Sequence, residues 1–270
     1  MKQAFIILSC ILSLFANKVA ASSNRSLIES TLQTYIKATS HNQPEELSDV
    51  FYKDAELFLD HKDKIIWTVS ITEYQSWFKQ DNQFNGRIGE IISIDIENNI
   101  ATAKVEILVP SKQQRYIDLF LLKKINDKWV VISKSATSEK ANSNAQRILF
   151  IVSNAHFHGK SKLAAGVSFG EIVKAYDTFK NAGYTVDFVS PEGGAIPLSY
   201  INTAIPIHKK YLYNKDFMYA IGNTKTPNHI IPSHYKAVHY IGGTNAMYGV
   251  ADNKSIQKIT MEIYEMHNVL

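Results

Sequence analysis

The chain has 270 residues, 45% hydrophobic and 20% charged, a composition typical of globular protein that buries a core and not of a disordered chain. Its formal net charge is +4, and removal of a leader containing Lys2 and Lys18 would lower this to +2. So small and evenly spread an excess of positive charge predicts no nucleic-acid partner and no attraction to an anionic membrane surface.

Residues 1–21 have the pattern of a secretory signal peptide. Lys2 precedes an apolar run over residues 4–16, and Val19-Ala20-Ala21 suits cleavage by signal peptidase. The run is shorter than the roughly 20 residues that span a bilayer. We therefore expect an exported protein, periplasmic or secreted, with no membrane attachment after cleavage. The only cysteine, Cys10, lies in this leader, so the mature chain has no thiol.

Residues 22–138 have the pattern of helices followed by an antiparallel sheet. Ser26 and Glu29 form a capping box that predicts a helix to about Thr39. From Glu90 onward apolar residues alternate with polar ones, which predicts strands joined by the Asn98-Asn99 turn and later turns. The other expected elements are a helix over 45–52, a strand over 55–60, a helix carrying Tyr74, Trp77 and Phe78, and strands over 101–109, 113–125 and 129–135. Together they predict an α+β cone.

This pattern resembles the SnoaL-like (nuclear transport factor two-like) superfamily, particularly its lumazine-binding-like members. Residues 115–131, covering the last two strands, carry the resemblance most clearly. Members of that superfamily include isomerases and cyclases as well as domains that only bind or dimerise, so the fold alone does not give a function. The resemblance leaves open a small-molecule ligand and a homodimer.

The polar residues most suited to a pocket in the cone are Asp60, His61, Tyr116 and Asp118. An Asp in an apolar pocket could act as a base, because burial raises the pKa of a carboxyl group. The alternative is a solvated rim or a satisfied hydrogen-bonded pair. The sequence favours this second interpretation, because it identifies no acceptor beside a base.

After a polar linker, residues 139–146, the pattern changes to α/β over residues 147–270. Residues 148–152 are a continuous apolar run typical of a parallel strand covered on both faces. The further expected elements are a helix over 171–182 closed by Gly183, a strand over 185–189, a long excursion over 195–233, a strand over 237–241, and an amphipathic helix on which Ile256, Ile259 and Ile263 share a face. This order predicts a doubly wound, flavodoxin-like sheet with ligands at the carboxyl ends of its strands.

Three motifs in this region, residues 166–171, 189–194 and 241–243, resemble the ThiJ/PfpI superfamily, which is class I glutamine amidotransferase-like. The nearest branch is the chaperone/glyoxalase III type. The resemblance implies cysteine-dependent chemistry on a small carbonyl compound such as methylglyoxal, or hydrolysis. It implies that Glu171 is the acid partner of the cysteine and that the Gly243 backbone N–H contributes to an oxyanion hole. It implies no cofactor.

Each of these residues also has a simpler interpretation. Ser168 and Glu171 form a capping box, so Glu171 could do no more than close a helix end. Gly242-Gly243 could be only a turn. His156 and His158 are two residues apart in the loop after the first strand, but no third ligand is specified, so we predict no metal site.

The resemblance covers only the first half of a ThiJ/PfpI domain, and the cysteine and histidine of such a site would follow Leu270. We therefore expect the domain to be cut short, with its third strand at an open edge. Three hypotheses follow: a chain derived from an exported ThiJ/PfpI-like enzyme and lacking its nucleophile, a non-catalytic binding or dimerising protein built on the cone, and an enzyme that uses Asp60 or Asp118.

Overall fold

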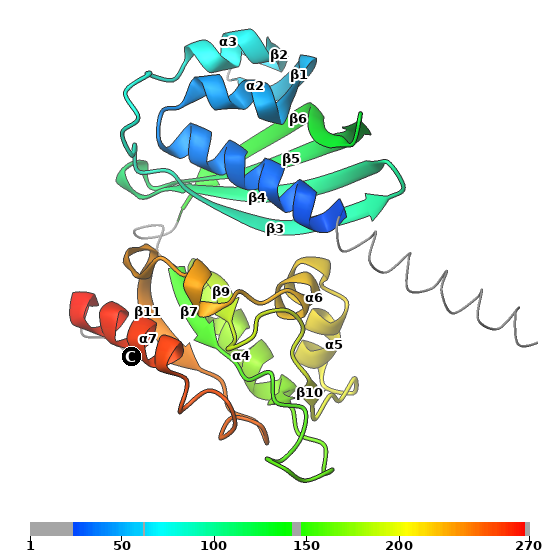
Figure 1. Cartoon of the computed structure of the whole chain (residues 1–270), viewed down its shortest axis with the longest axis vertical. Coiled ribbons are helices and arrows are strands. Elements are labelled where there is room, and N and C mark those ends of the chain that lie inside the picture. Colours follow the sequence, from blue (N-terminus) through cyan, green and yellow to red (C-terminus); the bar gives the residue numbers. More distant parts are fainter. Residues whose placement is uncertain (1–23, 62, 142–146, 268–270) are drawn as a thin grey trace, which may run out of the picture. The chain divides into compact units, whose positions relative to one another are not determined.

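The computed structural model describes residues 24–61, 63–141 and 147–267 (Figure 1). The predicted signal peptide and most of the predicted linker lie outside these residues. The chain divides into two compact units, Met1–Leu108 with Tyr116–Glu139 and Val109–Arg115 with Lys140–Leu270. In the part of the chain that is described, no helix is long and apolar enough to cross a membrane.

The first unit is one six-stranded sheet with helices packed on one face (Figure 1). The strand order is β2-β1-β6-β5-β4-β3, in which β1 and β6 are parallel. A helix over residues 24–40 comes first. The further elements are η1 Pro44–Glu46, α2 Leu47–Val50, β1 Phe51–His61, β2 Lys64–Ser70, α3 Ile71–Ser76, β3 Ile88–Glu97, β4 Ile100–Val109, η2 Pro110–Lys112, β5 Gln114–Ile125 and β6 Lys128–Lys140.

The core of this unit consists of apolar residues that recur at helical spacing in the first helix and at every second position in the strands. Ile28, Leu32 and Tyr35 are fully buried on one side of the first helix, as the spacing of four and three residues requires. Val105 and Ile107 of β4 are buried with them, because alternate residues of a strand face the same side. The apolar pattern thus places one face of the sheet against the helices.

Local predictions in this unit fail at several places. Ser26 lies inside the first helix, which already includes residue 24, so the predicted capping box is wrong. Strand β2 was not predicted, because Ile65 and Ile66 are consecutive, exposed apolar residues without alternation. Its pairing with β1, with Leu57 opposite Val69, depends on tertiary contacts that no local pattern reveals. Strand β6 continues to Lys140, two residues into the predicted linker.

The second unit contains a three-stranded parallel sheet of order β11-β7-β9. Strand β7 comes first in the sequence and lies in the centre, which is the arrangement that a doubly wound sheet begins with. The elements are β7 Arg147–Ile151, β8 Val167–Ser168, α4 Phe169–Asn181, β9 Thr185–Val189, β10 Leu198–Ser199, α5 Pro206–Leu212, α6 Lys215–Gly222, η4 Pro227–His229, η5 Pro232–His234, β11 Tyr235–Tyr240 and α7 Lys254–His267.

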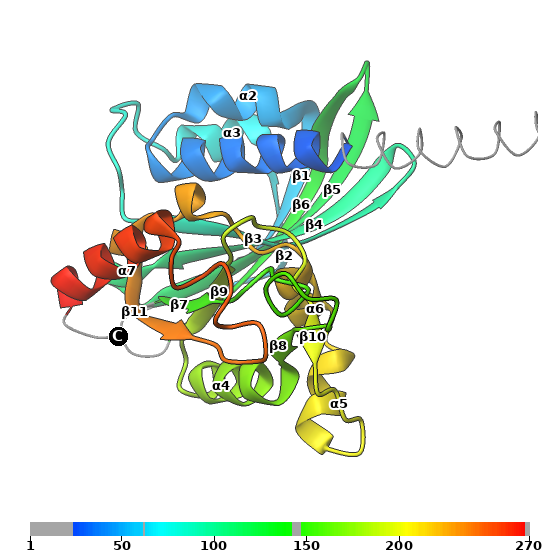
Figure 2. The ribbon, with the colours of Figure 1, turned by 60° about the horizontal axis from the view of Figure 1, so that its bottom comes forward.

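Helices α4 and α7 cover opposite faces of this sheet (Figure 2). Ile148 and Phe150 of β7 pack with Ile172 of α4, whereas Leu149 and Ile151 belong to the cluster that includes Ile256, Ile259 and Ile263 of α7. The continuous apolar run of β7 is therefore needed on both faces. The predicted fold class, an α+β cone followed by an α/β domain, is confirmed.

A buried ion pair lies at the junction of the three parallel strands. The Nε and Nη2 of Arg147 donate to the two carboxylate oxygens of Asp187 at 2.7 and 2.9 Å. The hydroxyl of Tyr235 donates to Asp187 at 2.8 Å, and the Lys225 amine lies 3.7 Å away. Burial alone would raise the pKa of Asp187, but Arg147, Lys225 and these hydrogen bonds hold it well below its usual value. Asp187 therefore connects β7, β9 and β11.

Candidate functional site

Glu171 lies in the first turn of α4, and its carboxylate reaches the end of β11. Its Oε1 accepts a hydrogen bond from the Gly242 N–H at 2.7 Å. Ser168 is the N-cap residue of α4, but its side chain makes no capping hydrogen bond. The local capping interpretation of Glu171 is therefore wrong, and its partner is 71 residues away in the sequence.

The Gly242-Gly243 turn packs tightly against the segment that leads into α4. Ser168 N–H donates to the Gly242 carbonyl at 3.1 Å, and Thr244 N–H donates to the Gly166 carbonyl at 3.0 Å. Gly243 has φ +137°, and a Cβ there would lie 2.5 Å from the Gly166 oxygen, so only glycine fits. Among the described residues, the Gly243 N–H has no hydrogen-bond acceptor. It remains a donor beside the Glu171 carboxylate.

His239 is a neighbour of this corner that the sequence pattern did not identify. Burial lowers the pKa of His239, and the Glu171 carboxylate acts in the opposite direction. The ring packs 5.0 Å from Phe150 and 5.8 Å from Phe179, on the α4 side of the sheet. Its position one residue before the end of β11 would have placed it at the ligand-binding edge, but a single His gives no spacing pattern.

The loop after β7 is held in place by two asparagines. The buried Asn245 donates from Nδ2 to the carbonyls of Ser153 and Ala155, at 3.2 and 3.0 Å. Asn154 accepts from Glu192 N–H and donates to the Gly193 carbonyl, which fixes the turn after β9. These contacts bring the loops at the carboxyl ends of β7, β9 and β11 together. His156 and His158 follow in this loop, and the described residues contain no group of three potential metal ligands.

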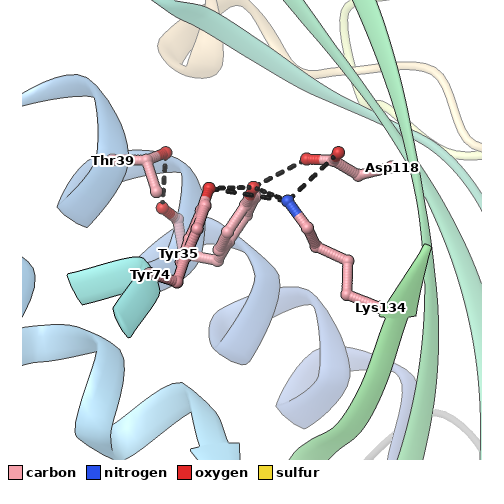
Figure 3. A network of polar contacts seen from close by, with 5 residues as sticks. All are labelled: Tyr35, Thr39, Tyr74, Asp118 and Lys134. Carbon is pink, nitrogen blue, oxygen red and sulfur yellow. Dashed lines mark hydrogen bonds and ion pairs between the residues drawn. The ribbon is translucent and has the colours of Figure 1, made fainter. Parts of the chain in front are cut away.

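In the first unit, Asp118 belongs to a buried polar network (Figure 3). Its Oδ2 accepts from the Tyr35 hydroxyl at 2.6 Å, and its Oδ1 lies 3.2 Å from the Lys134 amine. Lys134 also contacts the Tyr35 and Tyr74 hydroxyls at 3.0 and 3.5 Å. The side chains of Lys134 and Asp118 are each 3% exposed. Both oxygens of Asp118 are thus engaged, as in the predicted alternative of a satisfied hydrogen-bonded pair. This arrangement favours a structural role for Asp118 over a role as a catalytic base.

The other two residues predicted for the cone lie in different surroundings. Tyr116 is on β5, and its ring lies under the guanidinium of Arg87, with the Cζ atom 5.8 Å from the ring centroid. Asp60 is exposed near the end of β1 and does not join the network. The neighbouring His61 packs 5.2 Å from the ring of Trp67. Lys134 and Arg87 were missed, because a charged residue in a strand pattern is normally read as exposed.

Comparison with known proteins assigns relatives to both parts. The profile of a family described as putative lumazine-binding matches residues 23–135. A probable glutathione-independent glyoxalase of Saccharomyces cerevisiae, SNO4, is 30% identical over 129 residues, which are 44% of this chain and 54% of the yeast protein. A glutathione-independent glyoxalase of Schizosaccharomyces pombe is 28% identical over 111 residues, 39% of this chain and 46% of that protein.

The chain spans about half the length of these curated relatives. A crystal structure of an NTF2-like protein of unknown function from Methylobacillus flagellatus is 28% identical, covers 43% of this chain and 93% of its own, and has a TM-score of 0.39. Residues 23–135 are thus similar to a putative lumazine-binding family, and part of the chain is homologous to glutathione-independent glyoxalases of two yeasts.

Proposed function

We propose that the second unit carries the carboxylate part of a thiol-dependent site for a small 2-oxoaldehyde such as methylglyoxal. The supporting observation is the 2.7 Å hydrogen bond between Gly242 N–H and Glu171. It holds a carboxylate next to the Gly243 N–H at the carboxyl end of the sheet, where doubly wound folds bind their ligands.

In this proposal each group has one task. Glu171 accepts and returns the proton of the attacking thiol. The Gly243 N–H donates to the carbonyl oxygen of the aldehyde as it gains negative charge, and a donor aimed at that charge lowers the barrier. The only cysteine of the sequence is Cys10, in the predicted signal peptide. The mature chain by itself is therefore expected to be without thiol-dependent turnover.

The test fuses residues 22–270 to the C-terminal half of a glutathione-independent glyoxalase, and measures lactate formed from methylglyoxal without glutathione. We expect no turnover by the unfused chain and turnover by the fusion. Glu171→Gln in the fusion should lower the rate by about 100-fold or more, the usual contribution of a positioned acid or base. Glu265→Gln, at an exposed carboxylate of α7 in the same unit, is the matched control.

Two results would contradict the proposal. One is turnover by the unfused chain, which has no thiol to supply. The other is a folded fusion whose rate is the same with and without the Glu171 carboxylate, because the proposed proton carrier would then be unnecessary.

Export is the second part of the proposal. The pattern of residues 1–21 supports it, and these residues lie outside the described structure. N-terminal sequencing of the protein from its native source should begin at Ser22, and a native protein that retains Met1 and lies in the cytosol would contradict export.

A further inference from the structure

Arg87 is a partly shielded cation of the first unit, and no carboxylate of the described residues forms an ion pair with its guanidinium. It directly precedes β3, its side chain is only partly exposed, and its Nε atom is buried. Within the described residues, the guanidinium has no hydrogen bond or ion pair, and it lies against the face of the Tyr116 ring. Partial burial without a partner costs a charged group some of its hydration, so a bound anion would stabilise this arrangement.

The surrounding groups cannot supply that anion. Asp118 is the carboxylate of the network, and both of its oxygens are engaged by Tyr35 and Lys134. Arg87, Lys134 and Asp118 together carry a formal charge of +1. Burial lowers the pKa of Arg87, but electrostatic interactions with Tyr74, Tyr35 and Asp118 outweigh it and raise the pKa above its usual value. The guanidinium therefore stays charged.

The loop before β3 fixes where Arg87 lies. Asn85 donates from Nδ2 to the Thr39 carbonyl and to Asn42, each at 2.8 Å, and its N–H donates to the Ser40 carbonyl at 2.9 Å. Its Oδ1 accepts from the Arg87 N–H at 3.2 Å. These bonds attach the loop to the end of the first helix, so the backbone at Arg87 is held in place before any ligand arrives.

We propose that Arg87 binds the carboxylate group of a small organic acid in the first unit, next to the Tyr116 ring. One carboxylate balances the single excess positive charge of the group. The planar guanidinium presents paired N–H donors that match the two oxygens of a carboxylate, and the aromatic face beside it suits the apolar body of such an acid. This binding site does not depend on the function proposed for the second unit.

The experiment is calorimetric titration of residues 22–270 with benzoate, lactate and inorganic phosphate. We expect saturable binding of at least one of the carboxylates and none of phosphate. Arg87→Met should weaken carboxylate binding by tenfold or more, and Arg87→Lys should weaken it less, because the charge remains but the paired donors are lost. Arg25→Met, the same change elsewhere in this unit, is the control and should leave binding unchanged.

A stability measurement separates a ligand site from a structural role. If Arg87 serves a ligand, Arg87→Met removes an unpaired cation, and without ligand the variant should unfold at the same temperature as the parent or higher. Benzoate or lactate should raise the melting temperature of the parent and not of this variant. Undiminished carboxylate binding by Arg87→Met, binding of phosphate alone, or no saturable carboxylate binding by the parent would each overturn the proposal.

Discussion

Replacing Asp187 with asparagine should destabilise the second unit selectively. The change leaves Arg147, whose side chain is 1% exposed, as a buried cation without its carboxylate. Breaking a buried ion pair from one side costs about 3–5 kcal/mol, and the weaker bond to Tyr235 adds to this. For a domain of between 100 and 150 residues, a loss of about 4 kcal/mol lowers the melting temperature by roughly 10–20 °C.

The two units can be followed separately, because all three tryptophans, Trp67, Trp77 and Trp129, lie in the first unit. Their fluorescence reports the unfolding of that unit in urea, whereas far-ultraviolet circular dichroism reports both. We expect Asp187→Asn to shift only the dichroism transition of the second unit. Asp252→Asn, at an exposed position of the same unit, should change its free energy of unfolding by no more than about 0.5 kcal/mol.

The effect of pH provides an independent check. The pKa of Asp187 is depressed in the folded state, so its contribution to stability is complete above the unfolded value of about 3.9 and is lost as the pH falls below it. The second unit of the parent should therefore lose its advantage over Asp187→Asn in acid. A loss below about 1 kcal/mol at pH 7, or an equal shift of the tryptophan transition, would refute the reasoning.

Three further predictions concern other buried groups. Lys134→Met should destabilise the first unit by about 3–5 kcal/mol, as measured by its tryptophan transition. Adding Asp118→Leu should recover most of this loss, because it removes the unpaired carboxylate. A double variant as unstable as Lys134→Met would contradict the pairing of Lys134 with Asp118. Gly243→Ala should lower the melting temperature of the second unit more than Gly249→Ala does, because both have positive φ but only Gly243 lacks space for a Cβ. Burial, with Arg147, lowers the pKa of His234 to about 4. The contribution of neutral His234 to stability is therefore complete above about pH 6.5 and is lost as the pH falls toward 4. His234→Gln should flatten the pH dependence of the free energy of unfolding in this window, and an unchanged slope would exclude His234 as its source.

The strands with a clear apolar pattern were the part of the fold that the sequence could predict. The alternation of β3 and β4 and the apolar runs of β7 and β9 each follow from burial of one or both faces, and their residues carry that pattern locally. Helices α5 and α6 were missed inside the long excursion, although Pro206 at the first turn of α5 and the Asn214 cap of α6 were usable markers. Short helices give too few turns for an apolar period to stand out.

The candidate site residues are brought together by tertiary contacts, which no local sequence pattern reveals. Glu171 could be identified only through a family resemblance, and its bond to Gly242 required the folded sheet. Arg87, Lys134 and Arg147 are charged side chains that the fold shields, and a charged residue is by default assigned to the surface. Asp60 is predicted to face the cavity of the cone, but β1 leaves it in solvent.

The position of β7 at the centre of its sheet has a consequence for the order of folding. Arg147 pairs with Thr185 of β9 and with Tyr235 of β11, and the second connection closes a loop more than twice as long. Each doubling of loop length adds about 0.6 kcal/mol to the entropic cost of closure, so we expect β7 and β9 to associate first and β11 to dock onto them. Pulsed hydrogen exchange during refolding should then protect β9 amides before those of β11. In that sequence Asp187 meets Arg147 in the early pair and receives the Tyr235 hydroxyl last, so one carboxylate would mark both the beginning and the completion of the sheet.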